Sequence, residues 1–380
     1  MTPKWQSGDG IDAFLQALVA WKGSDIYLTA GAEPRVRIEG VVAPVASWVL
    51  TAEHLEALTQ AFLTKAQLDE FSATRELNLA VVSAESRRFR VNVHRQRGAI
   101  GIVIRRIQTA VPTLAELAVP PVLATIALAR RGLVLITGAA GSGKSTLAAA
   151  MLDHRNTNAP GHILTVEDPI EFVHDHKRCV VTQREVGTDT ASFASALRNS
   201  LRQAPDVIFI GEVRDTETME AAISFSETGH LCVATLHANN ANQAVERIIN
   251  FFPVARHPQI LLLLALNLRA LLSQRLISGV DGARVAALEI MTDTPLVREH
   301  LKRGEIDLLK DAMRQPQEAS GGCRTFDEAL FDLVEAGRIS EEQALANADT
   351  RNDLRLRFQS GRFQREPSLT ANPAASMPQH

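Results

Sequence analysis

The pattern of apolar and polar positions divides the chain into two regions. Before residue 108, short runs that are apolar or that alternate with polar residues predict strands, interrupted by stretches with helical spacing. After residue 121, buried strands alternate with helices, a pattern typical of a parallel sheet covered by helices on both faces. We therefore predict an α/β protein with at least two domains, which the length of 380 residues also favours.

The first region is predicted to form a separate α/β domain over residues 1–108. Thr51 begins one helix, and His54 stands where a glutamate would ordinarily complete a capping box. The proline-punctuated stretch 109–121 predicts a linker. The predicted helices are 11–21 and 51–62, and the predicted strands are 25–29, 35–38, 77–82, 89–93 and 99–107.

The second region is predicted to contain a core over 122–290, a helical region over 291–357 and a tail over 358–380. The tail lacks apolar periodicity, so we predict that it is disordered. Core strands are predicted at 133–137, 162–166, 179–182, 206–210 and 231–236, with helices at 146–152, 193–202 and 216–225. Later helices are predicted at 294–303, 306–313, 326–335 and 340–348.

One apolar run and the composition limit the class of protein. Residues 260–272 are strongly apolar, but Asn267 and Arg269 interrupt them and a membrane span needs about 20 residues, so we predict a core helix. A net charge of −3 gives no general attraction to nucleic acid. Three widely spaced cysteines and the lack of an apolar N-terminal signal favour a cytoplasmic, reduced protein without a cysteine metal site.

A glycine-rich segment directly after the predicted strand 133–137 carries the clearest chemical signal. It matches the phosphate-loop pattern G-x-x-x-x-G-K-[ST], and an Ala- and Leu-rich helix follows it. Glycines let backbone N–H groups approach a phosphate, Lys144 supplies a charge for the β- and γ-phosphates, and the Ser145 hydroxyl can ligate Mg²⁺. We predict that these residues bind a nucleoside triphosphate: Gly138, Ala139, Ala140, Gly141, Ser142, Gly143, Lys144, Ser145 and Thr146.

Acidic residues follow two predicted strands, where a phosphate-loop enzyme needs a metal-positioning acid and a group that activates water. Glu212 follows the strand 206–210, and we predict that it acts on the Mg²⁺ shell, with a structural salt bridge as the alternative. Glu167 follows the strand 162–166 and precedes an Asp-Pro pair that restrains the turn, so we predict that it is the general base. The acids assigned structural roles are Asp168, Glu171 and Asp206.

Two histidines bracket the predicted strand 231–236. Seven residues of extended strand approach a length of about 20 Å, so His230 and His237 cannot share one pocket. We predict that His237, at the carboxyl end of the strand, senses γ-phosphate hydrolysis. For His230 we predict a place at a surface between domains or subunits.

Arginines crowd the end of the first region. One interpretation is a solvated basic face of the sheet. The other is that some of them reach a nucleotide on the core in the manner of arginine fingers. Both interpretations stay open for Arg87, Arg88, Arg90, Arg95, Arg97, Arg105 and Arg106.

Four segments together resemble the motifs of type IV pilus and type II secretion ATPases. They are GAAGSGKST (138–146), ILTVEDPIEFVH (163–174), RQAPDVIFIGEVRD (202–215) and a long histidine-containing segment (227–253), similar to the Walker A, Asp-box, Walker B and His-box motifs. The resemblance spans about residues 5–357. Within this group the chain is most similar to the PilT/PilU family of twitching-motility ATPases. Three runs resemble the PilU-like members most: VTQREVG, LHANNANQA and DLRLRF.

The resemblance implies a PAS-like N-terminal domain, a RecA-like core and a helical C-terminal region, with ATP and Mg²⁺ as cofactors. It implies a homo-hexamer whose active sites lie between a subunit's core and N-terminal domains. It further implies ATP-driven pilus retraction, with a PilT-like ATPase and an inner-membrane platform protein as partners. The expected location is the cytoplasm, peripheral to the inner membrane and in some cells at the pole.

The same resemblance implies roles for individual residues. Glu167 matches the catalytic acid of the Asp-box, Glu212 matches the Walker B acid, and His230 and His237 match the His-box histidines. Arg90 and Arg105, with Arg95 as a further candidate, match arginines that reach nucleotide phosphate.

The sequence differs from related motors in two places that bear on which kind of ATPase it is. Retraction motors of the PilT type carry an AIRNLIR-like helix, whereas residues 295–303 keep Arg298 but not that pattern, which favours a PilU-like member. Assembly ATPases usually carry a tetracysteine zinc motif, which three scattered cysteines cannot form. The alternatives that stay open are a pilus assembly or type II secretion ATPase, and a weakly hydrolysing nucleotide-binding partner of a PilT motor.

Overall fold

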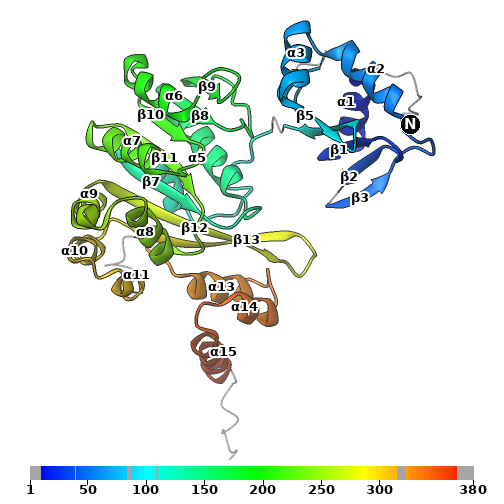
Figure 1. Cartoon of the computed structure of the whole chain (residues 1–380). Coiled ribbons are helices and arrows are strands. Elements are labelled where there is room, and N and C mark those ends of the chain that lie inside the picture. Colours follow the sequence, from blue (N-terminus) through cyan, green and yellow to red (C-terminus); the bar gives the residue numbers. More distant parts are fainter. Residues whose placement is uncertain (1–9, 39, 84–86, 108–109, 315–321, 366–380) are drawn as a thin grey trace, which may run out of the picture. The chain divides into compact units, whose positions relative to one another are not determined.

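The computed structural model describes residues 10–38, 40–83, 87–107, 110–314 and 322–365 (Figure 1). The chain divides into two compact units. The first runs to Val111 and also includes Leu164–Gln203, and the second comprises Pro112–Ile163 and the chain from Ala204 onward. The division at Val111 falls within the stretch 109–121 in which the sequence predicts a linker, while the predicted domain boundaries themselves stay predictions.

The N-terminal residues form a six-stranded sheet in the order β3-β2-β1-β6-β5-β4, in which the paired strands run antiparallel. Its buried face packs on an apolar core that includes Phe14, Leu15 and Phe89. The strands are β1 (Asp25–Thr29), β2 (Arg35–Ile38), β3 (Val41–Pro44), β4 (Glu76–Val82), β5 (Arg88–Gln96) and β6 (Ala99–Arg106), and the helices are α1 (Ile11–Ala20), α2 (Ala52–Phe62) and α3 (Lys65–Thr74).

The capping box predicted at the start of α2 is confirmed. The Thr51 hydroxyl accepts the His54 N–H at 3.2 Å, and His54 Nδ1 accepts the Thr51 N–H at 3.3 Å. The imidazole therefore takes the place of the glutamate that usually closes this motif. Strand β3 and helix α3 were not predicted, because their short, mostly exposed sequences lack a clear apolar period.

The second sheet has seven strands in the order β13-β12-β7-β11-β10-β8-β9. Strand β7 lies between β12 and β11 and runs parallel to both, whereas β13 pairs antiparallel with β12. The strands are β7 (Gly132–Thr137), β8 (Gly161–Glu167), β9 (Cys179–Glu185), β10 (Val207–Ile210), β11 (Leu231–Leu236), β12 (Leu268–Ser278) and β13 (Arg284–Thr292).

Helices cover both faces of this sheet at its centre. Every residue of β7 and β11 is buried, which requires packing on each side of the sheet. Helices α5 and α7 both contact these two strands. The helices between the strands are α4 (Val122–Ala127), α5 (Lys144–Asn158), α6 (Phe193–Ser200), η1 (Leu201–Gln203), α7 (Thr216–Glu227), α8 (Ala241–Asn250), η2 (Val254–Arg256) and α9 (His257–Asn267).

The core helix predicted over 260–272 is wrong in its second half. Helix α9 ends at Asn267, Leu268 has extended torsion angles, and Leu268–Ser278 forms β12. An apolar run that is buried on all sides looks the same in a helix and in a central strand, so periodicity could not locate this boundary. Pairing with β7 on one side and β13 on the other decides it in favour of the strand.

The C-terminal helices follow β13 and pack beside it. Phe326, Leu330 and Phe358 belong to an apolar cluster that includes residues of β12 and β13. Helix α15 continues to Arg365, so residues 358–365, predicted as the start of a disordered tail, are helical, and 366–380 lie outside the described residues. The helices are α10 (Pro295–Arg303), η3 (Ile306–Leu308), α11 (Leu309–Met313), α13 (Phe326–Glu335), α14 (Glu341–Asn347) and α15 (Arg351–Arg365).

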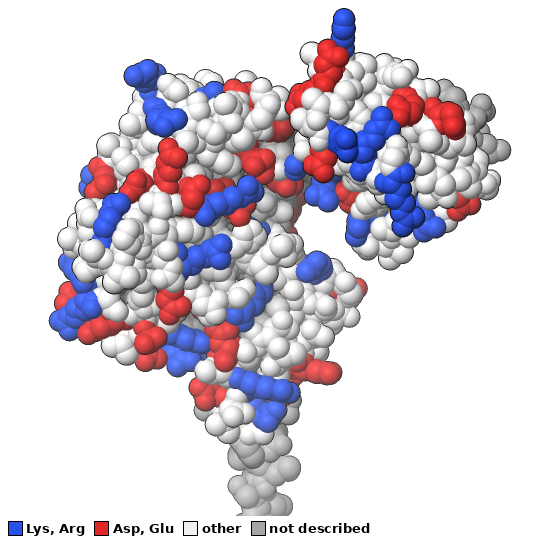
Figure 2. Space-filling view, in the orientation of Figure 1, with Lys and Arg blue, Asp and Glu red and all other residues white. Residues whose placement is uncertain are grey.

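Two surface properties of the chain are the distribution of its charged side chains and the length of its apolar helices. On the face shown in Figure 2, basic and acidic side chains alternate over most of the second unit, so this face carries no extended field of one sign. Among the described helices, none is by itself long and apolar enough to cross a membrane, although Ala241–Asn250 and Val254–Asn267 together reach that length with a bend of 118° between them.

The assignment of Leu271 to a central strand predicts a large stability difference between two leucines that the sequence alone does not distinguish. Leu271 is fully buried in β12, whereas Leu262 on α9 is 45% exposed. We expect Leu271→Ala to lower the free energy of unfolding by about 2–5 kcal/mol. The matched control Leu262→Ala is expected to change it by less than about 0.5 kcal/mol. Urea unfolding followed by circular dichroism measures both, and equal effects would contradict the strand assignment.

Candidate active site

The phosphate loop joins the centre of the sheet to helix α5, and two of its glycines, Gly138 and Gly143, meet close contacts that a side chain would disturb. Gly138 has φ +154°, and a Cβ there would contact Ser142 Oγ and lie 2.6 Å from the Gln274 carbonyl oxygen. Gly143 has φ +86°, and its Cβ would lie 2.7 Å from Gln274 Nε2. Residues with side chains would therefore push the loop away from β12 as well as strain its backbone.

Lys144 is the first residue of α5, and its ammonium group turns back onto the loop. Nζ donates to the carbonyl oxygens of Gly138 and Ala139, both at 2.8 Å. Burial lowers the pKa of this lysine, and the negative charge of Glu212 opposes that shift. The group is thus a desolvated cation that two carbonyl dipoles and the charge of Glu212 stabilise, and it can bind an anion such as a phosphate oxygen. The first N–H groups of α5 point in the same direction as in other helix N-termini that bind phosphate.

Glu212, His237 and Lys144 are brought together at the carboxyl ends of neighbouring strands. Glu212 Oε1 lies 3.0 Å from His237 Nε2, and Glu212 Oε2 accepts a hydrogen bond of 2.7 Å from Arg214 Nε. The acid is therefore both paired with a basic residue, as in the alternative interpretation, and close enough to influence Lys144. Its predicted role in the Mg²⁺ shell stays a prediction.

Backbone contacts with β11 fix the position of Glu212. The Val213 N–H donates to the Thr235 carbonyl oxygen at 2.8 Å, and the Thr235 hydroxyl donates to the Gly211 carbonyl oxygen at 2.5 Å. The residues on either side of the acid are thus held by the strand that leads to His237. This explains why the carboxylate and the imidazole meet.

His230 lies at the other end of β11, as its position in the sequence required. Its Nδ1 is 3.0 Å from the Thr228 hydroxyl oxygen and 3.2 Å from the Phe225 carbonyl oxygen, and its ring meets the Phe225 ring edge-on. These contacts tie it to the end of α7. The structure therefore separates the two histidines.

Glu167 ends β8 with a buried carboxyl group. Oε1 accepts hydrogen bonds from the Thr165 hydroxyl at 2.7 Å and from Gln183 Nε2 at 3.2 Å, and the Glu171 backbone N–H contributes a further bond. Burial outweighs these bonds and raises the pKa of Glu167 to about 7. A carboxyl group with this pKa is suited to proton transfer at neutral pH. Gln183 was not predicted as a site residue, because its partner Glu167 lies 16 positions away and the run VTQREVG does not indicate this contact.

Asp206, which the sequence predicts to be a turn or cap residue, joins two strands instead. Its Oδ2 accepts the His162 N–H at 2.7 Å, and its own N–H donates to the His162 carbonyl oxygen at 2.8 Å. Both bonds join the beginnings of β8 and β10. Asp206 therefore lies at the opposite end of its strand from Glu212.

One arginine of the N-terminal cluster, Arg105, is paired with an acid that the sequence did not reveal. Arg90 and Arg105 are paired in register on β5 and β6, and Arg105 Nε donates to Asp25 Oδ1 at 2.7 Å. Asp25 is buried and also lies 3.4 Å from Arg37 Nε, while its hydrogen bond raises the pKa of Arg105. Arg95 is held by Glu56 at 2.6 Å. Contact of these arginines with nucleotide stays a prediction.

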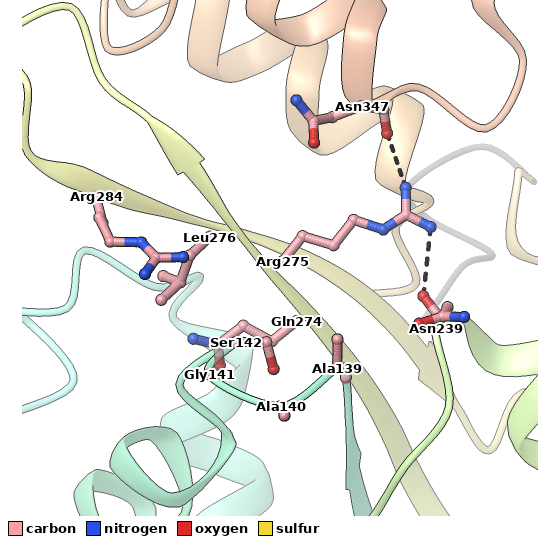
Figure 3. A pocket seen from close by; sticks show the side chains of 11 residues that line it. Ala139, Ala140, Gly141, Ser142, Asn239, Gln274, Arg275, Leu276, Arg284 and Asn347 are labelled. Carbon is pink, nitrogen blue, oxygen red and sulfur yellow. Dashed lines mark hydrogen bonds between the residues drawn. The ribbon is translucent and has the colours of Figure 1, made fainter. Parts of the chain in front are cut away.

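A cavity of about 190 Å³ opens beside the phosphate loop (Figure 3). Arg275 on β12 crosses it and donates to the carbonyl oxygens of Asn347 at 2.8 Å and Asn239 at 3.3 Å. Ser142 Oγ and Gln274 Oε1 are buried at its edge without a hydrogen-bond partner among the described residues. These polar atoms make the cavity suitable for a polar ligand next to bound phosphates. The sequence did not indicate the residues of β12, β13 and α14, which lie more than a hundred positions from the loop.

Comparison with known families and proteins gives extended matches. The family model described as type II/IV secretion system protein matches residues 10–320. The type IV pilus ATPase PilU of Pseudomonas aeruginosa is 48% identical over 351 residues, which are 92% of this chain and 91% of that protein. The type IV pilus retraction ATPase PilT of the same organism is 40% identical over 325 residues, which are 86% of this chain and 94% of that protein.

Solved structures share the fold over similar lengths. The crystal structure of the pilus retraction motor PilT with bound ADP matches with a TM-score of 0.85 and 34% identity, covering 92% of this chain and 99% of that one. The Legionella pneumophila ATPase DotB matches with a TM-score of 0.77 and 26% identity, covering 91% of this chain and 99% of that one. The predicted fold, a RecA-like ATPase core with an N-terminal α/β region and a helical C-terminal region, is confirmed.

The loop geometry predicts that two of its glycines tolerate alanine to different extents. We expect Gly138→Ala to weaken the binding of a fluorescent ADP analogue by at least about tenfold, because the new Cβ collides with the backbone of β12. Gly141 has φ +75° but no atom within 4 Å of a Cβ, so Gly141→Ala is expected to weaken binding less, by about three- to fivefold. A Gly141→Ala variant that binds more weakly than Gly138→Ala would contradict this account of the loop.

Proposed function

The chain belongs to the family of type II/IV secretion system proteins, and we propose that it is the ATPase motor subunit of a type IV pilus retraction machine. As a member of this family it is an ATP-hydrolysing enzyme. The observation that carries the proposal is the 48% identity to a type IV pilus ATPase over 92% of the chain. That relative is PilU, and the lower identity of 40% to PilT favours a PilU-like member that acts with a PilT-like ATPase.

The geometry supports a division of labour around the phosphates of ATP. Lys144 and the N-terminus of α5 bind the β- and γ-phosphates, with the loop from Gly138 to Gly143 wrapped around them. Glu167 is the general base that aligns the attacking water, since its pKa lies near neutrality. His237 responds to the γ-phosphate through its contact with Glu212. The resemblance to the family, rather than the geometry, leads us to propose that Arg90 and Arg105 neutralise charge that develops on the phosphate.

The residues present fit a magnesium ion that is held largely by the nucleotide. The described residues contain no group of three or more His, Cys, Asp or Glu side chains that could hold a metal alone. Ser145 offers an exposed hydroxyl in the first turn of α5, and Glu212 offers a carboxylate nearby. Oxygen ligands of this kind suit Mg²⁺, which keeps waters and binds phosphate oxygens. The ion would supply Lewis-acid stabilisation of the phosphates.

The coverage of the relatives favours retraction over assembly or secretion. The type II secretion protein E of Xanthomonas campestris matches 40% of this chain and 25% of its own length, whereas PilU and PilT match most of both chains. With only three cysteines, the chain also cannot supply a tetracysteine zinc site. We therefore propose a homo-hexamer that works at the inner-membrane platform protein, peripheral to the membrane on its cytoplasmic side.

The deletion phenotype tests the proposed function. Cells without this protein are expected to keep their pili, or to carry more of them, and to lose part or all of their twitching motility. A plasmid copy with Lys144→Ala is expected not to restore motility, because the variant cannot bind the phosphates. Pilus counts by electron microscopy and the expansion of twitching zones measure both. Loss of pili on deletion would instead support an assembly ATPase.

Phosphate release by the purified protein separates a motor from a weakly hydrolysing partner. A motor hydrolyses ATP alone, and a partner subunit does so mainly when mixed with its PilT-like ATPase. The Lys144→Ala variant gives the background for both assays.

The pKa of Glu167 predicts how turnover depends on pH. A general base acts when it is deprotonated, so the active fraction decreases as pH falls through the pKa of about 7. We expect kcat/KM for MgATP to fall about tenfold for each pH unit well below neutrality. Glu167→Gln is expected to remove most of the activity and to leave a residual rate that lacks this slope. A wild-type profile that is flat through neutral pH would contradict the assignment.

A further inference from the structure

Three buried polar side chains form a row that runs from the edge strand β13 through β12 to β7 in the second sheet. Thr137 on β7 is paired in register with Ser273 on β12, and Ser273 is paired with Glu289 on β13. Thr137 and Ser273 are fully buried, and Glu289 is 2% exposed. Because residues opposite one another on adjacent strands point to the same face, the three side chains are neighbours.

Hydrogen bonds connect the row in one direction. The Thr137 hydroxyl donates to Ser273 Oγ at 3.0 Å, and Ser273 is hydrogen-bonded to the Glu289 side chain. An ionised carboxylate only accepts, so the Ser273 hydroxyl donates to it and the chain of bonds ends on Glu289. This series of hydrogen bonds begins at Thr137, the residue immediately before Gly138. It therefore links the start of the phosphate loop to an acid on the third strand.

Glu289 also binds the segment that follows His237. Its Oε1 accepts the backbone N–H of Ala241, the first residue of α8, at 2.6 Å. Arg275, two residues from Ser273, donates to the Asn239 carbonyl oxygen at 3.3 Å. We define residues 237–241 as the sensor loop. Two of its backbone attachments therefore come from β12 and β13, the strands that carry the polar row.

A carboxyl group at this position is not explained by packing. Its neighbours on the same face of β13, Ala287 and Met291, are buried apolar residues of the core. Burial raises the pKa of Glu289 to about 7, Asp349 acts in the same direction, and Lys310 opposes it. An apolar side chain would fill the space without this desolvation. What an apolar residue could not do is accept the two hydrogen bonds from Ser273 and Ala241.

We infer that Glu289 is a positioning residue that couples the sensor loop to the phosphate loop. Movement of His237 when the γ-phosphate leaves pulls on the N-terminus of α8, and the carboxylate passes that displacement through Ser273 to Thr137 and Gly138. The reverse path lets occupancy of the phosphate loop set the position of His237. This inference rests on the proposed function, since it assumes that the chain hydrolyses ATP and that His237 responds to the γ-phosphate.

A double-mutant cycle on the full chain tests the coupling. Ser273→Ala breaks the row with little change in volume, and His237→Ala removes the sensor. We expect each variant to lower kcat for MgATP by about five- to twentyfold, with KM changed by less than about threefold. If both act through one element, the double variant is expected to be within about twofold of the slower single variant. Effects that multiply, or a wild-type kcat for Ser273→Ala, would overturn the inference.

Substitutions of Glu289 itself give a second, independent readout. Glu289→Gln keeps an acceptor for the Ala241 N–H and a polar partner for Ser273, so it is expected to stay within about threefold of wild-type kcat. Glu289→Ala removes both bonds and is expected to match Ser273→Ala or to be slower. Should Glu289→Ala fail to fold, the Ser273 cycle still decides. Equal losses in the Gln and Ala variants would overturn a role based on hydrogen bonding.

Two controls separate failure of this inference from failure of the proposed function. Ser278→Ala makes the same change at the exposed end of β12 and is expected to leave kcat unchanged. Absence of ATP hydrolysis by the wild-type chain, or unchanged turnover in Lys144→Ala, would overturn the proposed function. If the wild-type chain hydrolyses ATP normally but the losses in kcat of Ser273→Ala and His237→Ala multiply in the double variant, only the coupling is overturned.

Discussion

The candidate site depends on one constraint, the burial of β7 at the centre of a parallel sheet. Because its parallel neighbours end at the same edge, the register decides which side chains meet beside the phosphate loop. Thr137 pairs with Leu236, so His237 follows directly opposite Gly138. Ile210 pairs with Ala234, and just beyond the strand the Val213 N–H donates to the Thr235 carbonyl oxygen, which holds Glu212 close to the end of β11. The 3.0 Å contact between Glu212 and His237 is a consequence of this register.

Strand ends and motifs make part of this arrangement predictable from the sequence. The strands β7 and β11, the phosphate loop and the two acids after β8 and β10 were each predicted at or next to their positions, because a short apolar run followed by a glycine or an acid is a local signal. The run 260–272 was assigned to one helix because a fully buried strand has no polar face to show its period. Only the pairing with β7 and β13 identifies residues 268–272 of this run as part of a strand.

The residues that sequence reasoning missed are polar groups whose partners lie far away in the chain. Glu289 binds Ala241 and Ser273, and Gln183 binds Glu167, so neither acts within its own motif. Asp25 was missed for the same reason, although it changes the meaning of the arginine cluster. Like charges directly opposite one another on adjacent strands destabilise a sheet, and Asp25 on β1 offsets this for Arg90 and Arg105. Within this cluster Arg105 and Arg95 are thus each paired with an acid, Asp25 and Glu56.

The buried ionisable groups of the core share a feature that bears on how ATP could drive movement. Lys144 is held by carbonyl oxygens, Glu167 by a hydroxyl and an amide, and Glu289 by a backbone N–H and a hydroxyl. Each is therefore stabilised mainly by neutral dipoles and remains sensitive to charge placed nearby. A bound triphosphate brings several negative charges to Lys144, and the loss of its γ-phosphate removes part of them. The phosphate loop and the sensor loop are both attached to the strands that carry the polar row, so a change in that charge acts on both loops together. A motor needs this property to convert hydrolysis into displacement.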